Sequence, residues 1–468
     1  MNEKTPIIIG FLIITVILFI GLKFFLLFTE RCVTDADCRS LKCPGAYCDN
    51  GKCKCPEIWP HPKNISQIKV AVQYRYVTDG NIIDRSVKDT IKIFKELNAD
   101  FIFQGWITQK PCPEKCSDWP TKEEREKCEF FGKSYEHLRN ALSEIKKELP
   151  DIIFCGGTQA EFLYPEEVGN SRLILEPQDR DKAWEMALNP EKWNINVSRR
   201  EIQCYWARRW GSVGKNEPCP RDGELKQKME KYFPDLTNPE FQKIFLDRIY
   251  KQIDAGVDVI WIDMLYMQAQ LMNLLTKNPD HPAVIESYKA SQEIVDKIHK
   301  YGERKGKRIY VITWVAVIRG NSIIGASKKY VNVDAAMVSP SSDEIRDKFT
   351  GKIGNFDEEL WDRLVKKIKK EYKIPVFAMI DYGGPGRTSL YVFSQELSKE
   401  EAKEFLRKTD EFFSKKGIIF IYPLHGGDMG RKEMMIKKRA YGKFNWYDSL
   451  APEFGTYETI KELARKKK

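Results

Sequence analysis

Apolar runs of strand length alternate with amphipathic stretches of helix length along most of the chain, from about residue 65 onward. This alternation is typical of a parallel sheet whose strands are connected by helices. The strands are expected at residues 68–77, 100–107, 152–158, 257–263, 308–316, 335–339, 375–380 and 418–423. Eight such strands favour a closed barrel over an open sheet, so the predicted fold class is α/β, a (β/α)8 TIM barrel.

The stretches between the strands have apolar residues at helical spacing. In residues 84–97, for example, Val87, Ile91, Phe94 and Leu97 fall on one face. Further helices are expected at residues 134–149, 238–255, 281–305, 357–372 and 398–416, with a closing helix at 456–465. The longest loops of the predicted barrel are residues 108–132 after strand two and 159–237 after strand three. Loops of this length usually carry function, although they are also added as decoration.

The first part of the chain has a different pattern. Residues 6–28 are apolar apart from Lys23, which is long enough for a helix that crosses about 30 Å of hydrocarbon. No small-residue cleavage site follows, which favours a retained anchor over a removed signal peptide. We therefore expect a transmembrane anchor at residues 1–30, a cysteine-rich module at 31–56 and the barrel at 57–468.

Twelve cysteines fall into two groups of six. The first group lies in a segment with almost no large hydrophobic residues and comprises Cys32, Cys38, Cys43, Cys48, Cys53 and Cys55. Such a segment needs cross-links, so three disulfides in an oxidising compartment are expected, with a zinc knuckle as the alternative. The second group, also expected to form disulfides, comprises Cys112, Cys116, Cys128, Cys155, Cys204 and Cys219. The cysteines and the anchor together predict a membrane-anchored, extracytoplasmic protein.

Composition narrows the class of partner. The formal net charge is +10, but basic residues are interspersed with acidic ones along the predicted helices, so we expect no nucleic-acid partner. Abundant lysine, glutamate and isoleucine are typical of a thermophile. The five histidines show no metal-ligand spacing, and the chain has no dinucleotide or Walker-type loop. We therefore expect no metal and no cofactor.

Asp263 is the most informative position for chemistry. It ends the apolar strand at 257–263, and the carboxyl ends of barrel strands are where active sites form. The segment from Phe233 to Pro239, followed by the segment from Gly256 to Met264, resembles the "PDxTNP … GVDGxWxDM" pattern of barrel glycoside hydrolases of the α-glucosidase and α-galactosidase type. That resemblance implies a nucleophile at Asp263. The chain departs from the α-glucosidase pattern at Leu265 and Tyr266, where that pattern continues with Asn-Glu.

Glycoside cleavage needs a second carboxyl group, which protonates the leaving oxygen. The sequence offers three candidates, Asp381 after strand seven, Asp343 after strand six and Glu161 after strand three. Two of them also suit a purely structural role, Asp343 as the first residue of a helix and Asp381 as a turn residue before glycines. The choice among them stays open at this point.

Aromatic, amide and cationic residues near the strand ends are candidates for sugar binding, because sugars present flat apolar faces and a rim of hydroxyls. The candidates are Gln73, Tyr74, Gln104, Trp106, Trp314, Tyr382 and His425, together with Trp206, Arg208, Arg209 and Trp210 of the long third loop. An aromatic residue on a strand is, however, more often part of the core. The predicted function is a cell-surface glycoside hydrolase or related glycan-processing enzyme with a polysaccharide substrate; the alternative is a glycan-binding or surface-structural barrel without catalysis.

Overall fold

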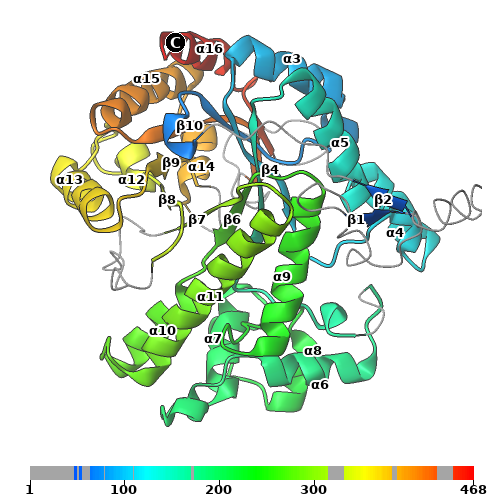
Figure 1. The fold of residues 1–468 in the computed structure, drawn as a ribbon. Helices are drawn as coiled ribbons and strands as arrows, with labels where there is room; N and C mark the ends of the chain where they lie inside the picture. Colours follow the sequence, from blue (N-terminus) through cyan, green and yellow to red (C-terminus); the bar gives the residue numbers. More distant parts are fainter. Residues whose placement is uncertain are drawn as a thin grey trace, which may run out of the picture. The chain divides into compact units, whose positions relative to one another are not determined.

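The computed structural model describes residues 47–49, 52–54, 64–78, 80–108, 110–169, 173–314, 331–381, 387–428 and 446–467. Within this part of the chain, eight parallel strands form a closed barrel with helices around it (Figure 1). The strands are β3 (Ala71–Tyr74), β4 (Phe101–Thr108), β5 (Ile153–Gln159), β6 (Val259–Asp263), β7 (Tyr310–Trp314), β8 (Ala335–Val338), β9 (Val376–Ala378) and β10 (Ile419–Asp428). The predicted TIM barrel is confirmed.

Strand β10 closes the barrel. Ile421 is in register with Ala71 of β3, and on the other side Ile419 is in register with Phe377 of β9, both in parallel orientation. The remaining strands pair in sequence order from β3 to β9. A short strand that the sequence did not predict, β11 (Trp446–Asp448), is antiparallel to β10.

Helices follow most of the strands. They are α2 (Gly80–Ile83), α3 (Val87–Leu97), α4 (Lys122–Phe131), α5 (Tyr135–Glu148), α6 (Pro177–Met186), α7 (Arg199–Arg209), α8 (Asp222–Lys228), α9 (Pro239–Asp254), α10 (Met267–Thr276), α11 (Pro282–Arg304), α12 (Ser342–Ile345), α13 (Glu358–Lys367), α14 (Ser389–Tyr391), α15 (Lys399–Lys415) and α16 (Tyr457–Lys466). Short 3-10 helices lie at 65–67, 116–118, 165–167 and 190–193, and π-helical segments lie at 368–372 and 392–396. The long loop after β5 contains α6, α7 and α8, which lie together in Figure 1.

Aromatic rings fill the interior of the barrel. Phe101 of β4 meets Phe377 of β9 with ring centroids 5.4 Å apart, and Phe103 of β4 meets Trp261 of β6 at the same separation. Strands β4 and β9 are not neighbours, so their rings can meet only across the barrel. The barrel is therefore a packed core that leaves chemistry to the loops at its ends.

The part of the chain before the barrel is described only as a hairpin. Strands β1 (Tyr47–Asp49) and β2 (Lys52–Lys54) pair antiparallel, with Cys48 opposite Cys53. The predicted anchor and the predicted disulfides of the first cysteine group lie outside the described residues. Among the residues that the structure does describe, no helix is long and apolar enough to cross a membrane.

A buried ion pair joins α5 to the start of β6. Lys146 pairs with Asp258, both nearly inaccessible, and also donates to the carbonyl of Ile152 at 2.9 Å. Asp258 accepts a further hydrogen bond from the backbone N–H of Phe154 at 2.8 Å. These bonds fix the helix against two strands that lead to the site described below.

We expect Lys146→Met to lower the free energy of unfolding by about 3–5 kcal/mol, because it leaves the Asp258 carboxylate buried without its cation. Chemical denaturation of the purified protein measures the change. The control is Lys415→Met, which breaks an exposed pair with Glu411 on α15 and should cost about 0.5 kcal/mol or less. Equal losses in the two variants would contradict the prediction.

Candidate active site

Asp263 is the last residue of β6, and the backbone around it has an uncommon conformation. The next residue, Met264, has a φ of +58°, which turns the chain sharply away from the strand. The Asp263 carbonyl accepts a hydrogen bond from Ala160 N at 3.0 Å. One carboxylate oxygen, Oδ2, accepts from Gln159 Nε2 at 3.3 Å, and the other, Oδ1, is buried without a hydrogen-bond partner among the described residues. Asp263 thus presents an unused carboxylate oxygen at the carboxyl end of the barrel.

Glu161 lies two residues beyond the end of the neighbouring strand β5. It is 2% exposed, and its Oε2 has no hydrogen-bond partner in the part of the chain that the structure describes. Burial, with a further contribution from the charge of Asp263, raises the pKa of Glu161 to about 8. The cations of Arg209 and Lys231 oppose this shift in the pKa. Glu161 is therefore suited to hold a proton at neutral pH.

Asp381 completes a group of three carboxyl residues with Glu161 and Asp263. It follows β9, where its backbone N–H donates to Ser339 Oγ at 3.1 Å and its carbonyl accepts from Leu390 N at 2.8 Å. Burial, followed by the charge of Asp381, raises the pKa of Asp263 to about 7. The charge of Asp381 thus acts on Asp263, and the charge of Asp263 acts on Glu161. We call Glu161, Asp263 and Asp381, which all follow strand ends, the carboxyl group cluster.

Asp343, the third candidate for the proton donor, is held in an ion pair. It is in the first turn of α12 and forms an ion pair with Arg387 at 2.6 Å. Arg387 also pairs with Glu396 at 2.7 Å. The residue that caps the helix is Ser341, not Asp343. The ion pair joins α12 to the segment after β9, and the role of Asp343 as proton donor stays a prediction.

Two of the predicted sugar-binding aromatics are packing residues instead. Trp106 is 1% exposed, and its ring packs against Tyr135 of α5 at 5.2 Å. Tyr74 is also 1% exposed, packs edge-on against Phe94 of α3 and shares a hydrogen bond of 3.0 Å with Thr90 of the same helix. Both side chains therefore lie between the sheet and the helices, where a glycan does not reach.

The other strand-end candidates have varied surroundings. Gln73 and Gln104 are buried and hydrogen-bonded to each other at 3.5 Å, while Trp314 is half-buried at the end of β7. His425 is buried and donates from Nδ1 to Asp448 of β11 at 2.7 Å. Tyr382 lies outside the described residues. These residues remain predicted sugar contacts.

The long loop after β5 adds aromatic and cationic residues from α7. Trp206 is buried against Phe233, with ring centroids 4.5 Å apart. Arg208 donates to the carbonyl of Glu217 at 2.6 Å and so holds two parts of the loop together. A disulfide between Cys204 and Cys219 joins α7 to the segment that precedes α8.

The two halves of the sequence pattern have different roles. Asp235 is buried and accepts hydrogen bonds from Thr237 Oγ1 at 2.8 Å and Gln268 Nε2 at 3.0 Å. Asn238 caps α9 by accepting from the N–H groups of Glu240 and Phe241. The first half therefore starts a helix, and only the second half, which ends in Asp263, supplies the site.

Sequence reasoning missed Gln159, Phe162 and Lys231. Gln159 donates a hydrogen bond to the Asp263 carboxylate. Lys231 lies close to Phe162 because their neighbours in the chain, Tyr232 and Leu163, form an isolated antiparallel bridge. Nothing in the periodicity of the chain signals this bridge, because its two strands are single residues in a long insertion.

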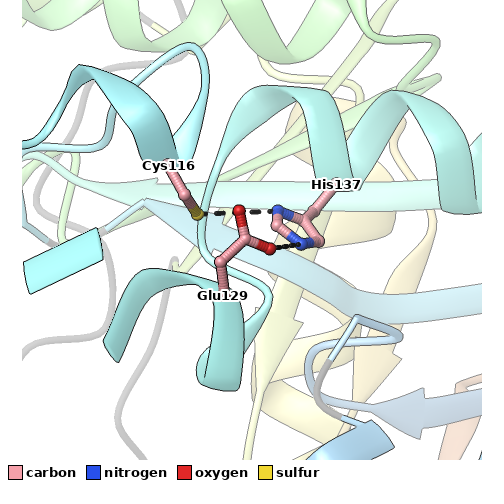
Figure 2. Close-up of side chains that lie close together, drawn as sticks. All are labelled: Cys116, Glu129 and His137. Atoms are coloured by element: carbon pink, nitrogen blue, oxygen red, sulfur yellow. Dashed lines mark hydrogen bonds and ion pairs between the residues drawn. The ribbon is translucent and has the colours of Figure 1, made fainter. Parts of the chain in front are cut away.

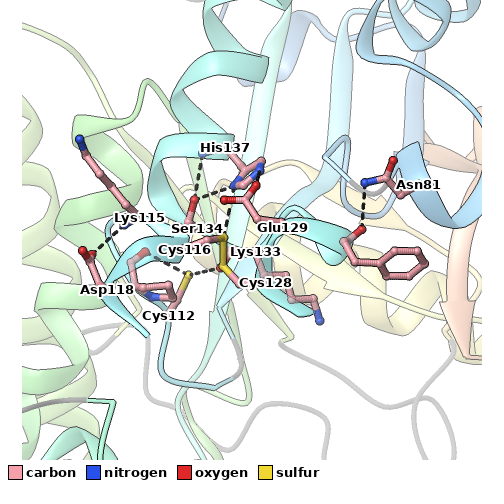
Figure 3. Close-up of a disulfide and its surroundings, with 12 residues drawn as sticks. Asn81, Cys112, Lys115, Cys116, Asp118, Cys128, Glu129, Lys133, Ser134 and His137 are labelled. Atoms are coloured by element: carbon pink, nitrogen blue, oxygen red, sulfur yellow. Dashed lines mark hydrogen bonds and ion pairs between the residues drawn. A yellow bond between two sulfur atoms is a disulfide. The ribbon is translucent and has the colours of Figure 1, made fainter. Parts of the chain in front are cut away.

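The disulfide prediction for the second cysteine group is correct for four residues and wrong for two. Cys116 pairs with Cys128, and Cys204 with Cys219, whereas Cys112 and Cys155 are free thiols. Cys155 is inside β5 and completely buried. Cys112 lies beside the first disulfide, where its Sγ approaches the carbonyl of Lys133 at 3.4 Å (Figure 3). Burial raises the pKa of both free thiols well above the usual range.

Cys116, Glu129 and His137 lie close enough together to suggest metal ligands (Figure 2). His137 Nε2 is 3.2 Å from the Glu129 carboxylate, and His137 Nδ1 is 2.7 Å from Ser134 Oγ. Cys116, however, is bound to Cys128, and a disulfide sulfur does not offer the thiolate that a metal requires. While the disulfide between Cys116 and Cys128 is intact, these three residues stabilise the loop after β4 and do not offer a metal site.

Comparisons with known proteins show no family and only limited similarity to solved structures. No family model matches the chain, and no curated protein matches it. A solved Gamma-CGTase from alkalophilic Bacillus clarkii is similar at 10% identity and a TM-score of 0.45, over 87% of this chain and 57% of that one. An α-amylase from Lactobacillus plantarum is similar at 10% identity and a TM-score of 0.44, over 86% of this chain and 81% of that one. Eubacterium rectale Amy13B is similar at 12% identity and a TM-score of 0.45, over 86% of this chain and 79% of that one.

This chain thus spans little more than half of the Gamma-CGTase. The similarity concerns the arrangement of strands and helices, and at these TM-scores it carries no argument about activity. The resemblance of the sequence to α-glucosidases and α-galactosidases stays a prediction.

Proposed function

We propose that the barrel is a glycoside hydrolase or a related glycan-processing enzyme, with Asp263 as nucleophile or base and Glu161 as proton donor. The observation that carries the proposal is the carboxyl group cluster at the carboxyl end of the barrel. Cleavage of a glycosidic bond requires one carboxyl group that is protonated and another that is ionised. Burial keeps Glu161 protonated at neutral pH more effectively than Asp263, because its pKa is the higher of the two.

Buried carboxyl groups without hydrogen-bond partners are costly, and they are common at catalytic sites. Asp263 Oδ1 and Glu161 Oε2 are two such atoms on neighbouring strands, within the part of the chain described. A substrate whose glycosidic oxygen accepts the Glu161 proton would give that carboxyl group its missing partner. Asp381 is the rival donor.

We expect the purified protein to cleave at least one member of a panel of polysaccharides and so to release reducing ends. The physical reason is that Asp263 would act as nucleophile or base while Glu161 protonates the leaving oxygen. A reducing-end assay on neutral, amino and acidic glycans measures this. Glu161→Gln and Asp381→Asn, compared on the best substrate, distinguish the two candidate donors. Binding of a glycan without cleavage of any would contradict catalysis and favour the glycan-binding alternative.

We also propose that the enzyme acts outside the cytoplasm, attached to the membrane by residues 6–28. Two disulfides in the loops of the barrel support this location, because such bonds persist in oxidising compartments.

A further inference from the structure

Lys231 is a partly buried cation beside the carboxyl group cluster. Its Nζ lies 3.5 Å from the centroid of the Phe162 ring and 4.5 Å from that of Trp210. Among the residues that the structure describes, no carboxylate lies within ion-pairing distance of Nζ and no acceptor is hydrogen-bonded to it. Its neighbour Glu230 pairs with Lys110 instead. The ammonium group therefore lies against aromatic faces, and the charges of Glu230 and Glu161 act on it without a direct ion pair, which leaves it able to bind an anion.

Arg209 lies over the same indole ring. Its guanidinium carbon is 5.9 Å from the Trp210 centroid and 5.6 Å from that of Trp206. Trp210 Nε1 is buried and has no hydrogen-bond partner within the described chain. We refer to Phe162, Arg209, Trp210 and Lys231 as the cationic wall.

The cationic wall adjoins the two proposed catalytic residues. The charge of Arg209 acts on both Glu161 and Asp263, and the charge of Lys231 acts on Glu161. Because burial raises the pKa of both carboxyl residues, they carry less than their full negative charge near neutral pH and do not cancel the two cations. The wall therefore keeps positive charge within reach of a sugar at the cleavage point.

The wall is also held in place from two sides. The disulfide between Cys204 and Cys219 fixes the helix that carries Arg209, and the bridge between Leu163 and Tyr232 fixes Lys231. A fixed cation beside an aromatic face matches a sugar that has both an apolar ring face and a carboxylate.

We propose that the cationic wall binds the carboxylate of an acidic glycan, so that the substrate contains uronic acid residues. This inference rests on the proposed hydrolase function and specifies its substrate class. Lys231 supplies the positive charge that recognises the carboxylate, and Arg209 adds a second positive charge nearby. Trp210 and Phe162 provide the apolar surface. Neither cation takes part in bond cleavage.

The test compares an acidic oligosaccharide, such as an oligogalacturonide or a hyaluronan fragment, with the same oligosaccharide after reduction of its carboxyl groups. We expect the unmodified protein to favour the acidic form by about tenfold or more in kcat/KM, because the neutral form leaves a partly buried cation without an anion. Lys231→Met should reduce kcat/KM on the acidic form about tenfold more than on the reduced form, chiefly through KM.

The matched control is Lys228→Met, which removes a lysine from the same insertion where it pairs with Glu224 at the surface. It should leave the preference for the acidic form unchanged. If Lys231 served only to adjust the proton affinity of Glu161, its loss would shift the pH profile equally for both substrates and keep the preference, which would overturn the inference.

The two proposals fail in different ways. Cleavage of neutral glycans with no preference for acidic ones would overturn the substrate class and leave the hydrolase intact. If neither form is cleaved, calorimetric titration of the acidic oligosaccharide decides the inference alone: binding weakened by Lys231→Met and unaffected by Lys228→Met supports it, and equal binding by all three proteins overturns it.

Discussion

Asp263→Asn is expected to lower turnover on a glycan substrate by about a thousandfold or more, a loss of about 4 kcal/mol in transition-state stabilisation. The substitution keeps the size of the side chain and its contact with Gln159 and removes the negative charge. If Asp263 is the nucleophile or base, that charge acts mainly in the transition state, so turnover should fall far more than substrate affinity.

Turnover and melting temperature should be measured on the same preparation. The control is Asp343→Asn, the same chemical change at the carboxylate that the structure pairs with Arg387. This control loses an ion pair and should keep most of its turnover. An Asp263→Asn protein that folds normally and retains more than about a tenth of the original turnover would rule out the assigned role, because the barrier would have changed by less than about 1.4 kcal/mol.

The second large effect concerns Glu161. As the proton donor it must be protonated, so kcat/KM should fall as the pH rises above about 8, its raised pKa. Asp263 must be ionised, so kcat/KM should also fall as the pH drops below about 7. The profile should therefore be a narrow bell, whose two apparent pKa values belong to the interacting carboxyl residues together.

Glu161→Gln should reduce turnover by about a hundredfold to ten-thousandfold and abolish the alkaline limb of the profile, because glutamine has no proton to lose. Aryl glycosides with a good leaving group need little protonation, so the variant should lose much less activity on them. A variant that keeps the alkaline limb, or that loses activity equally on both kinds of substrate, would exclude Glu161 as the donor and direct attention to Asp381.

The barrel and Asp263 could be predicted because both depend on local pattern. Apolar runs specify the strands, and a carboxylate that ends such a run must lie at the carboxyl edge of the barrel. Helix α10 and strand β11 escaped prediction, since Met267–Thr276 follows a strand without the usual capping residue and Trp446–Asp448 is only three residues long.

The choice of partner for Asp263 could not be made from sequence. Glu161, Asp343 and Asp381 all lie just beyond strands, and only the path of each loop decides which of them turn inward. Asp343 forms an ion pair with Arg387, and these two residues are far apart in the chain. The cationic wall has the same origin, because Lys231 reaches Phe162 through a bridge between single residues.

The position of β10 between β3 and β9 has a consequence for how the protein is made. Most of the chain separates Ala71–Tyr74 from Ile419–Asp428, so during synthesis β3 emerges from the ribosome long before the strand that closes the barrel, whereas Val376–Ala378 of β9 emerges shortly before it. Until then each presents an open row of backbone N–H and C=O groups, which is a template for pairing with another nascent chain. The barrel therefore passes through an aggregation-prone stage that ends only when β10 is in place.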